Sequence, residues 1–329
     1  FIMYQIAKSL GIKTILMHQS IFPNKYFTIK NCEDLGDIDI QNDTQDKSSF
    51  ENIDEIKNLY SEFINKKKNF IKKNLKKNKK INIYFFKNLI LKSLIKLKII
   101  HREDQEYLQK KYEKNLFKIE KKYDEIKSFK SGRKIIFFPL HLQPELTTSL
   151  LGGKYEDQIL VLEKLNSFAK DNWIVLAKEN QMQTSYQRND FFFKRLKGLK
   201  NVYFVHRNES TQQIMNDSDL VATICGTIGY EALMKSKKCL VFGNAWYKNF
   251  HGVLKVNNNT LDSTIESFIN NDFNKNKFLL DLQNLLSHCD NGVATHDEIY
   301  KIMVKDFDDN KNCKLILKNI IKFIDLNYK

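Results

Sequence analysis

The chain has 329 residues, in which 54 Lys and Arg outnumber 39 Asp and Glu, for a formal net charge of +15. This length suggests about two domains, because single domains commonly hold roughly 100–200 residues. Thirteen of the lysines lie in residues 65–100, which contain no acid, so the rest of the chain carries about +2. With so local a charge, few Arg and no aromatic–Gly RNA motif, the composition argues against a nucleic-acid-binding protein.

The chain begins with Phe1 and not with Met, in the middle of a helical pattern. Residues 1–10 predict a helix that a glycine ends, and residues 12–17 predict a short apolar strand. A loop follows at residues 18–27, and then an acidic, irregular stretch. We therefore expect that an N-terminal piece is missing and that residues 1–48 are the end of a domain.

Residues 49–131 form a second segment, which is helical in pattern and heavily charged. Within it, residues 81–100 are apolar but are interrupted by four Lys. A helix with that mixture can lie at an anionic membrane surface, with residues 65–100 as the contact. The alternative is a helical insert whose lysines are solvated. No run of about 18 uncharged apolar residues occurs, so we predict no transmembrane helix.

From residue 132 onwards the pattern changes to short apolar strands separated by helices. The five predicted strands are residues 134–138, 173–177, 201–205, 220–225 and 239–242. Buried strands that alternate with helices are typical of a parallel sheet covered on both faces. We therefore predict a doubly wound α/β domain at residues 132–256, followed by C-terminal helices at residues 257–329.

The five Cys residues are scattered and include no C-x-x-C or zinc-like pair. Cys225 and Cys239 lie in apolar runs, where Cys behaves as a small buried hydrophobic residue. This usage predicts a reducing, cytoplasmic setting. The acidic stretches "DID" and "DFDD", at residues 37–39 and 306–309, lie outside the predicted strand ends, so we predict no metal site.

Polar side chains follow the predicted strands at the points where they end. The candidates after the first two strands are His141, Gln143, Glu145, Thr147, Thr148, Lys178, Glu179 and Asn180. Ligands bind beyond the carboxyl ends of the strands in an open parallel sheet, so we expect these side chains to form a wall of one cleft. His206 and Arg207 follow the third strand and have a weaker claim, because strands near a sheet edge often end in solvated charges.

The segment "CGTIGYEAL" follows the fourth strand, and in it Gly226 and Gly229 flank Thr227 at the start of a helix. Free N–H groups at such a helix start favour a phosphate, to which Thr227 adds a hydroxyl donor. Glu231, one turn further, is placed to accept hydrogen bonds from a ribose diol. The alternative is a tight turn whose glycines serve packing, with Glu231 as an ordinary first-turn acid.

Other candidates also allow two interpretations. His141 and Glu145 are candidate catalytic bases, because a sugar hydroxyl needs a nearby base when it attacks, or they are part of the loop's scaffold. Lys178 can bind a diphosphate or pair with neighbouring acids. Trp246 and Tyr247 can stack on a base or a sugar, or form a packed aromatic loop.

The stretches "LHLQPELTTSLLGGKYEDQILVLEKL", "WIVLAKEN" and "ATICGTIGYEALMKSKKCLVFGNAWYKNFHGV" resemble bacterial capsule and surface polysaccharide biosynthesis proteins. These are similar to the Kdo-transferase-like glycosyltransferases of GT-B architecture, and the resemblance covers residues 134–256. "AKSLGIKTILMHQSIFPNKYF" also looks like the end of the family's N-terminal domain. The resemblance implies two Rossmann-like domains, with residues 1–48 as the remnant of the first, acceptor-side one. It also implies metal-independent transfer from a donor held mainly by the second domain.

Carried onto this chain, the resemblance implies that Thr227 and Glu231 bind the donor phosphate and ribose. The residues that it places along the cleft are Gln143, Glu145 and Thr148. Many relatives read Lys-Glu-His-Pro where this chain has Lys-Glu-Asn-Gln at residues 178–181. Asn180 can still donate a hydrogen bond but cannot carry a positive charge, so this change puts the donor's identity in question.

The sequence therefore predicts a cytoplasmic GT-B glycosyltransferase of surface polysaccharide assembly, peripheral to the inner face of the membrane if residues 65–100 bind lipid. The expected donor is a nucleotide-activated sugar such as CMP-Kdo, the expected acceptor is a glycan or glycolipid hydroxyl, and no cofactor is required. One alternative is transfer of a phosphate-containing group from a cytidine-activated donor. Another is a catalytically inactive assembly protein, which the altered Lys-Glu-His-Pro motif motivates.

Overall fold

The computed structural model describes residues 2–37, 58, 60–66, 69, 103–126, 132–169, 172–296 and 298–328. The chain divides into two compact units. One is Ile95–Phe278, and the other combines Phe1–Leu94 with Leu279–Lys329. The predicted membrane contact, residues 65–100, lies almost entirely outside the described residues.

The unit Ile95–Phe278 is built on a six-stranded sheet in the order β5-β4-β3-β6-β7-β8. Its strands are β3 (Lys134–Pro139), β4 (Trp173–Lys178), β5 (Val202–Val205), β6 (Leu220–Thr223), β7 (Cys239–Val241) and β8 (Val253–Lys255). Every neighbouring pair is parallel, which confirms the predicted parallel α/β sheet. The sequence does not predict β8, because this strand is only three residues long and ends in an exposed Lys.

Helices cover both faces of this sheet. The connecting helices are α6 (Ile159–Phe168), α7 (Asp190–Lys197), α8 (Thr211–Asp217) and α9 (Thr227–Met234). The chain moves from β3 to β4 and β5 in one direction and from β6 to β7 in the other, so right-handed crossovers place α6 and α7 on one face and α8 and α9 on the other. The strand order therefore reverses between the adjacent strands β3 and β6.

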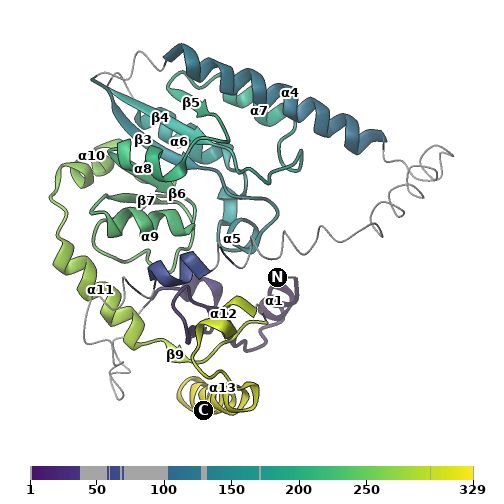
Figure 1. Cartoon of the computed structure of the whole chain (residues 1–329), viewed down its shortest axis with the longest axis vertical. Helices are drawn as coiled ribbons and strands as arrows, with labels where there is room; N and C mark the ends of the chain where they lie inside the picture. The colour runs from purple at the N-terminus through teal and green to yellow at the C-terminus, as the bar shows by residue number, and fades with distance from the viewer. Residues whose placement is uncertain are drawn as a thin grey trace. The chain divides into compact units, whose positions relative to one another are not determined.

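A long helix, α4 (Glu103–Ile126), also belongs to this unit and packs along the edge strand β5 (Figure 1). Its side chains Tyr112 and Leu116 are buried. The helix α10 (Asp262–Asn270) is part of the same unit and buries Ile265. The predicted boundaries at residues 131/132 and 256/257 therefore differ from the observed division, because amphipathic helices on both sides of the predicted sheet domain join its core.

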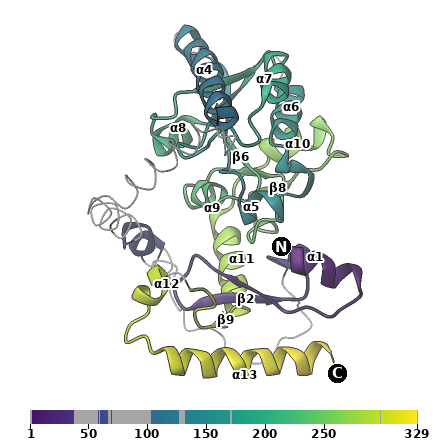
Figure 2. The same ribbon diagram turned by 90° about the vertical axis from the view of Figure 1, so that its right-hand side faces the viewer.

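The other unit contains a three-stranded sheet in the order β1-β2-β9. Its strands are β1 (Leu16–Gln19), β2 (Lys25–Ile29) and β9 (Asp290–Asn291), and its helices include α1 (Ile2–Ser9), α12 (Glu298–Met303) and α13 (Asp309–Asn327). Figure 2 shows α13 running beside β2 and β9. The amide of Asn319 in α13 donates to the hydroxyl of Tyr26 at 2.9 Å and to the carbonyl of Asn291 at 3.1 Å.

The three strands of this small sheet are antiparallel, whereas a Rossmann-like unit has parallel strands. A short turn after β1 folds β2 back beside it as an antiparallel hairpin, within a stretch that the sequence pattern indicates as loop. That residues 1–48 are the remnant of a Rossmann-like domain stays a prediction. The C-terminal helices are also divided, since α12 and α13 belong to this unit and α10 does not. Among the helices of the described residues, none is long and apolar enough to cross a bilayer.

Candidate active site

The carboxyl ends of β3 and β6 meet at the point where the strand order reverses, which is where open α/β sheets bind ligands. His141 follows β3, and its Nε2 lies 3.0 Å from Oγ1 of Thr223, the last residue of β6. The same hydroxyl accepts the backbone N–H of Gly226 at 3.1 Å. A Cβ atom on Gly226 would lie 2.8 Å from Cε1 of His141, so the glycine allows the imidazole to approach the start of α9.

The start of α9 has the features of an anion site. Gly226 is its N-cap residue and provides no side-chain cap, while Thr227 beside it is exposed. The Thr227 hydroxyl donates to Oε1 of Glu231 at 3.4 Å, and Gln212 of α8 donates to Oε2 of Glu231 at 2.6 Å. The predicted cluster of Gly226, Thr227 and Glu231 is therefore assembled on one helix terminus, next to His141.

Gly229 has a structural role and is not exposed to a ligand. It is buried in α9, and a Cβ atom there would collide with the side chain of Tyr247 and lie 2.9 Å from Sγ of Cys239. The packing interpretation is thus correct for this glycine. The donor-binding interpretation is wrong for it, because the buried face of α9 needs room for the Tyr247 ring.

Trp246 and Tyr247 are core residues, with exposed fractions of 7% and 0%. The Tyr247 hydroxyl donates to the carbonyl of Gly226, which supports the turn before α9. The ring of Trp246 packs on Tyr230, with 5.1 Å between the centroids. The predicted stacking of these two rings on a base or sugar is therefore wrong, and the packed aromatic loop is the correct interpretation.

The loop after β3 is held beside the same turn. The thiol of Cys225 donates to the carbonyl of Thr147 at 2.8 Å. Burial raises the pKa of Cys225 to about 12, and the negative charge of Glu145 adds to that rise. Glu145 is exposed, and its Oε2 accepts the Thr147 hydroxyl at 3.3 Å. Thr148 is buried, and its hydroxyl donates to the carbonyl of Glu145, so it supports the loop instead of lining a cleft.

Two of the predicted cleft residues, Gln143 and Glu179, are buried in a hydrogen-bonded network, with exposed fractions of 3% and 1%. Both contact Arg188, a residue that the sequence analysis misses because it lies in a loop without a recognisable pattern. Glu179 therefore pairs with Arg188 and not with Lys178. We correct the prediction that Gln143 and Glu179 contact the donor, since neither side chain faces solvent.

Lys178 is the last residue of β4, and Asn180 lies two residues after it. Lys178 is 6% exposed, and burial lowers its pKa, an effect that the nearby carboxylates of Glu120 and Glu179 oppose. No ion pair with another described residue engages its ammonium group. The side chain of Asn180 accepts the backbone N–H of Met182 at 2.9 Å and so stabilises the following turn.

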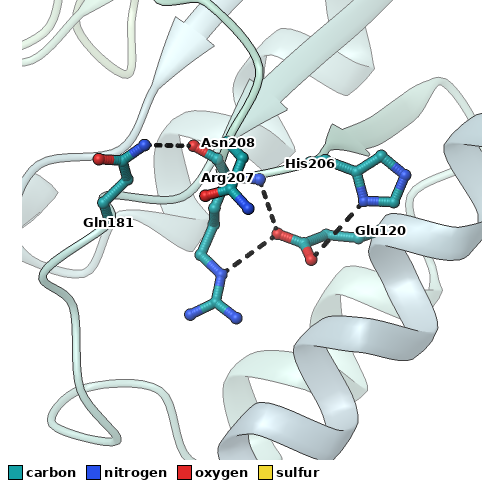
Figure 3. Close-up of a pocket in the computed structure, with 5 residues that line it drawn as sticks. All are labelled: Glu120, Gln181, His206, Arg207 and Asn208. Carbon is teal, nitrogen blue, oxygen red and sulfur yellow. Dashed lines mark hydrogen bonds and ion pairs between the residues drawn. The ribbon is translucent and has the colours of Figure 1, made fainter.

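A cavity of about 380 Å³ opens at the carboxyl ends of β4 and β5, beside α4 (Figure 3). It is lined by Glu120, Gln181, His206, Arg207 and Asn208. Oε1 of Glu120 accepts the backbone N–H of Arg207 at 3.0 Å and lies 3.4 Å from its Nε. Burial raises the pKa of Glu120. The sequence pattern supports His206 and Arg207 only weakly and does not indicate Glu120, whose only signal is its place in a charged helical run.

Among the residues that the structure describes, no group of three or more His, Cys, Asp or Glu side chains is placed to hold a metal ion. The predicted residues that the structure brings together around the switch point are His141, Glu145, Thr147, Gly226, Thr227 and Glu231.

The neutral imidazole of His141 predicts a pH-dependent stability. Burial lowers its pKa to about 4, whereas in the unfolded chain it takes up a proton below about pH 6.5. The neutral imidazole therefore makes its full contribution to the free energy of unfolding above pH 6.5, and this contribution is lost as the pH falls towards 4. At pH 4.5 the loss is about 2–3 kcal/mol. We expect His141→Gln, which keeps a hydrogen-bonding group for Thr223, to lose less stability than the wild type between pH 7.5 and 4.5. Urea unfolding at both pH values measures this, and equal losses would contradict it.

Comparisons with known proteins give one family and several distant structures. A family model described as "Capsule polysaccharide biosynthesis protein" matches residues 52–288, more than half of the chain. Among curated protein sequences there is no significant match.

Similar solved structures include KpsC of Thermosulfurimonas dismutans, a beta Kdo 2,7 transferase, at 13% identity and a TM-score of 0.33, over 55% of this chain and 57% of that one. Anabaena Alr3699/HepE, solved with UDP and glucose, has 13% identity and a TM-score of 0.34, over 62% of this chain and 52% of that one. S. aureus MnaA, solved with UDP, has 10% identity and a TM-score of 0.30, over 62% and 48%. The chain thus spans about half the length of these structures.

Proposed function

Because the chain belongs to the family of capsule polysaccharide biosynthesis proteins, we propose that it is a GT-B glycosyltransferase of surface polysaccharide assembly. In this proposal it transfers a sugar from a nucleotide-activated donor to a hydroxyl group of a glycan or glycolipid. The observation that carries the proposal is the meeting of His141, Thr223 and the start of α9 at the switch point of a parallel sheet. An open α/β sheet offers a phosphate-bearing ligand its natural site at that position.

The donor phosphate is proposed to lie at the start of α9. Gly226 leaves this helix end without a side-chain cap, and the exposed Thr227 adds a hydroxyl donor. The helix dipole favours a negative charge there. The Lys178 ammonium adds a positive charge at the same edge of the sheet, and Asn180 next to it is the remaining donor-side candidate after β4.

The donor nucleoside is proposed to extend from α9 towards β5. Glu231 would accept the ribose hydroxyls, and its bond to Gln212 already joins α9 to α8, the helix that follows the cavity-lining residues after β5. The cavity of about 380 Å³ would receive the base. Its volume falls within the usual range for small-molecule sites, roughly 300–1,000 Å³.

In the proposed reaction the acceptor oxygen forms a bond to the anomeric carbon while the bond from that carbon to the nucleotide phosphate breaks. Glu145 is exposed beside the α9 turn and takes the hydroxyl proton, with His141 as the second candidate base. The charge of the departing phosphate is stabilised by the start of α9 and by Thr227. Because His141 is neutral near pH 7 and packs against Gly226, it also orients this turn.

An acidic sugar such as that of CMP-Kdo is the proposed donor group, following the family resemblance. The thirteen lysines of residues 65–100 favour contact with the anionic inner face of the cytoplasmic membrane, so we propose a cytoplasmic, peripheral location. Transfer of a phosphate-containing group from a cytidine-activated donor would use the same phosphate site. An inactive assembly protein is the third proposal, supported by the absence of the His–Pro pair at residues 180–181.

A thermal-shift screen with CMP, CDP, UDP and GDP tests the proposed function. We expect a cytidine nucleotide to raise the melting temperature most, because the proposed donor is CMP-activated. A nucleotide present at 100 times its dissociation constant adds about 2.7 kcal/mol to the free energy of unfolding. Product analysis with labelled CMP- and CDP-activated donors then separates sugar transfer from transfer of a phosphate-containing group. If no nucleotide stabilises the chain while calorimetry shows that a glycan binds, the protein is a catalytically inactive assembly protein.

A further inference from the structure

The loops after β3 and β4 are joined by a buried network centred on Arg188. Its Nε donates to Oε2 of Glu179 at 2.7 Å, and its Nη2 donates to Oε1 of Glu179 at 3.3 Å. Its Nη1 donates to Oε1 of Gln143 at 2.6 Å, across 45 residues of sequence. Arg188 is 2% exposed, and its guanidinium also lies 4.9 Å from the centroid of the Phe192 ring. One side chain thus binds both loops.

The network extends to the backbone on each side. The side-chain amide of Gln143 donates to the carbonyl of Glu156 at 2.7 Å, and its backbone N–H donates to Oε1 of Gln183 at 2.9 Å. The amide of Gln183 in turn donates to the carbonyl of Tyr186 at 2.8 Å, close to Arg188 in the chain. The loop after β3 is therefore held at Gln143, two residues before Glu145.

The rest of that loop depends on this anchor. The backbone N–H groups of Thr148 and Ser149 donate to the carbonyl of Glu145 at 3.1 and 2.9 Å, and the Glu145 N–H donates to the Thr148 hydroxyl at 3.3 Å. The carbonyl of Thr147 is the contact with Cys225 at the α9 turn. A loop that turned differently at Gln143 would move Glu145 relative to the phosphate site.

We propose that Arg188 is a positioning residue, which sets the geometry between Glu145 and the start of α9 by fixing Gln143 to Glu179. The consequence for donor binding rests on the proposed function, whereas the consequence for the loop does not. The bidentate contact with Glu179 and the third contact with Gln143 need the planar, branched guanidinium, which Lys cannot replace.

The test uses a variant without the buried charges. Arg188→Met alone would leave Glu179 as an unpaired buried charge, which is strongly destabilising, so Arg188→Met is combined with Glu179→Leu. A second variant, Gln143→Leu, keeps the ion pair and removes the contact of Arg188 with the loop, together with the bond from Gln143 to the Glu156 carbonyl. Both are compared with the wild type by hydrogen exchange and by calorimetric titration with CMP.

We expect both variants to unfold cooperatively and to protect the Val175 amide in β4 as the wild type does. The amides of Thr148 and Ser149 are expected to exchange at least tenfold faster, and the affinity for CMP to fall at least fivefold. Unchanged exchange of these loop amides in a cooperatively folded variant would overturn the positioning role. If the wild type binds no nucleotide, the proposed function fails, and the exchange measurement still decides the role of Arg188.

Discussion

Replacing Thr227 and Glu231 together with Ala is expected to abolish the thermal stabilisation of this protein by its preferred nucleotide. The structure places both side chains on the first turns of α9, where they are hydrogen-bonded to each other and accessible from the helix start. Each hydrogen bond to a charged or strongly polar ligand group contributes about 1.5–3 kcal/mol. The loss of both hydrogen bonds should raise the dissociation constant of the nucleotide by about two orders of magnitude or more. A thermal-shift titration with the best nucleotide of the screen measures this.

A matched control is available in the same unit. Thr264→Ala with Glu266→Ala removes the same residue types from exposed positions of α10 and should leave the shift unchanged. Both double variants are expected to melt near the wild-type temperature without ligand. A Thr227/Glu231 variant that keeps the full nucleotide shift would show that the phosphate and ribose do not lie on α9.

Gly229→Ala is expected to destabilise the unit Ile95–Phe278 by about 2 kcal/mol or more, although Ala favours helices. The new methyl group would collide with Tyr247 and lie 2.9 Å from Sγ of Cys239, so the whole of α9 must move. The hydrogen bond from Tyr247 to the Gly226 carbonyl would also be strained. Because that carbonyl precedes the phosphate site, nucleotide affinity should fall together with stability. Urea unfolding gives the change in free energy.

Gly198→Ala is the control for this substitution, since the nearest atom to its added Cβ is the Arg195 carbonyl oxygen at 3.3 Å and nothing else lies within 4 Å. We expect a change of about 0.5 kcal/mol or less there. Tyr247→Phe, which removes the colliding hydroxyl, should make Gly229→Ala less damaging than in the wild-type background. Equal effects in both backgrounds would show that Tyr247 does not explain the requirement for glycine.

The sequence is sufficient to locate the candidate site at the strand ends, but it does not show which side chains bind a ligand and which support the loops. Polar residues after apolar runs correctly marked the strand ends, and the turn at Gly226 was identified as a candidate phosphate site. The positions of Gln143 and Glu179 after strands predict that both line the cleft, yet both side chains are buried against Arg188. A strand's end position is set by local pattern, whereas the direction of each loop side chain depends on partners that are distant in sequence.

The parallel α/β sheet can be predicted from the sequence alone, because strands buried on both faces require the short, continuous apolar runs that recur between helices. Tertiary structure alone decided which glycine serves packing, which acid is paired and which loops meet. It also decided the small antiparallel sheet, in which Tyr26 of β2 pairs with Asp290 of β9 from the far end of the chain. Hydrophobic periodicity reports only neighbours within a few residues, so contacts between distant segments carry no local signal.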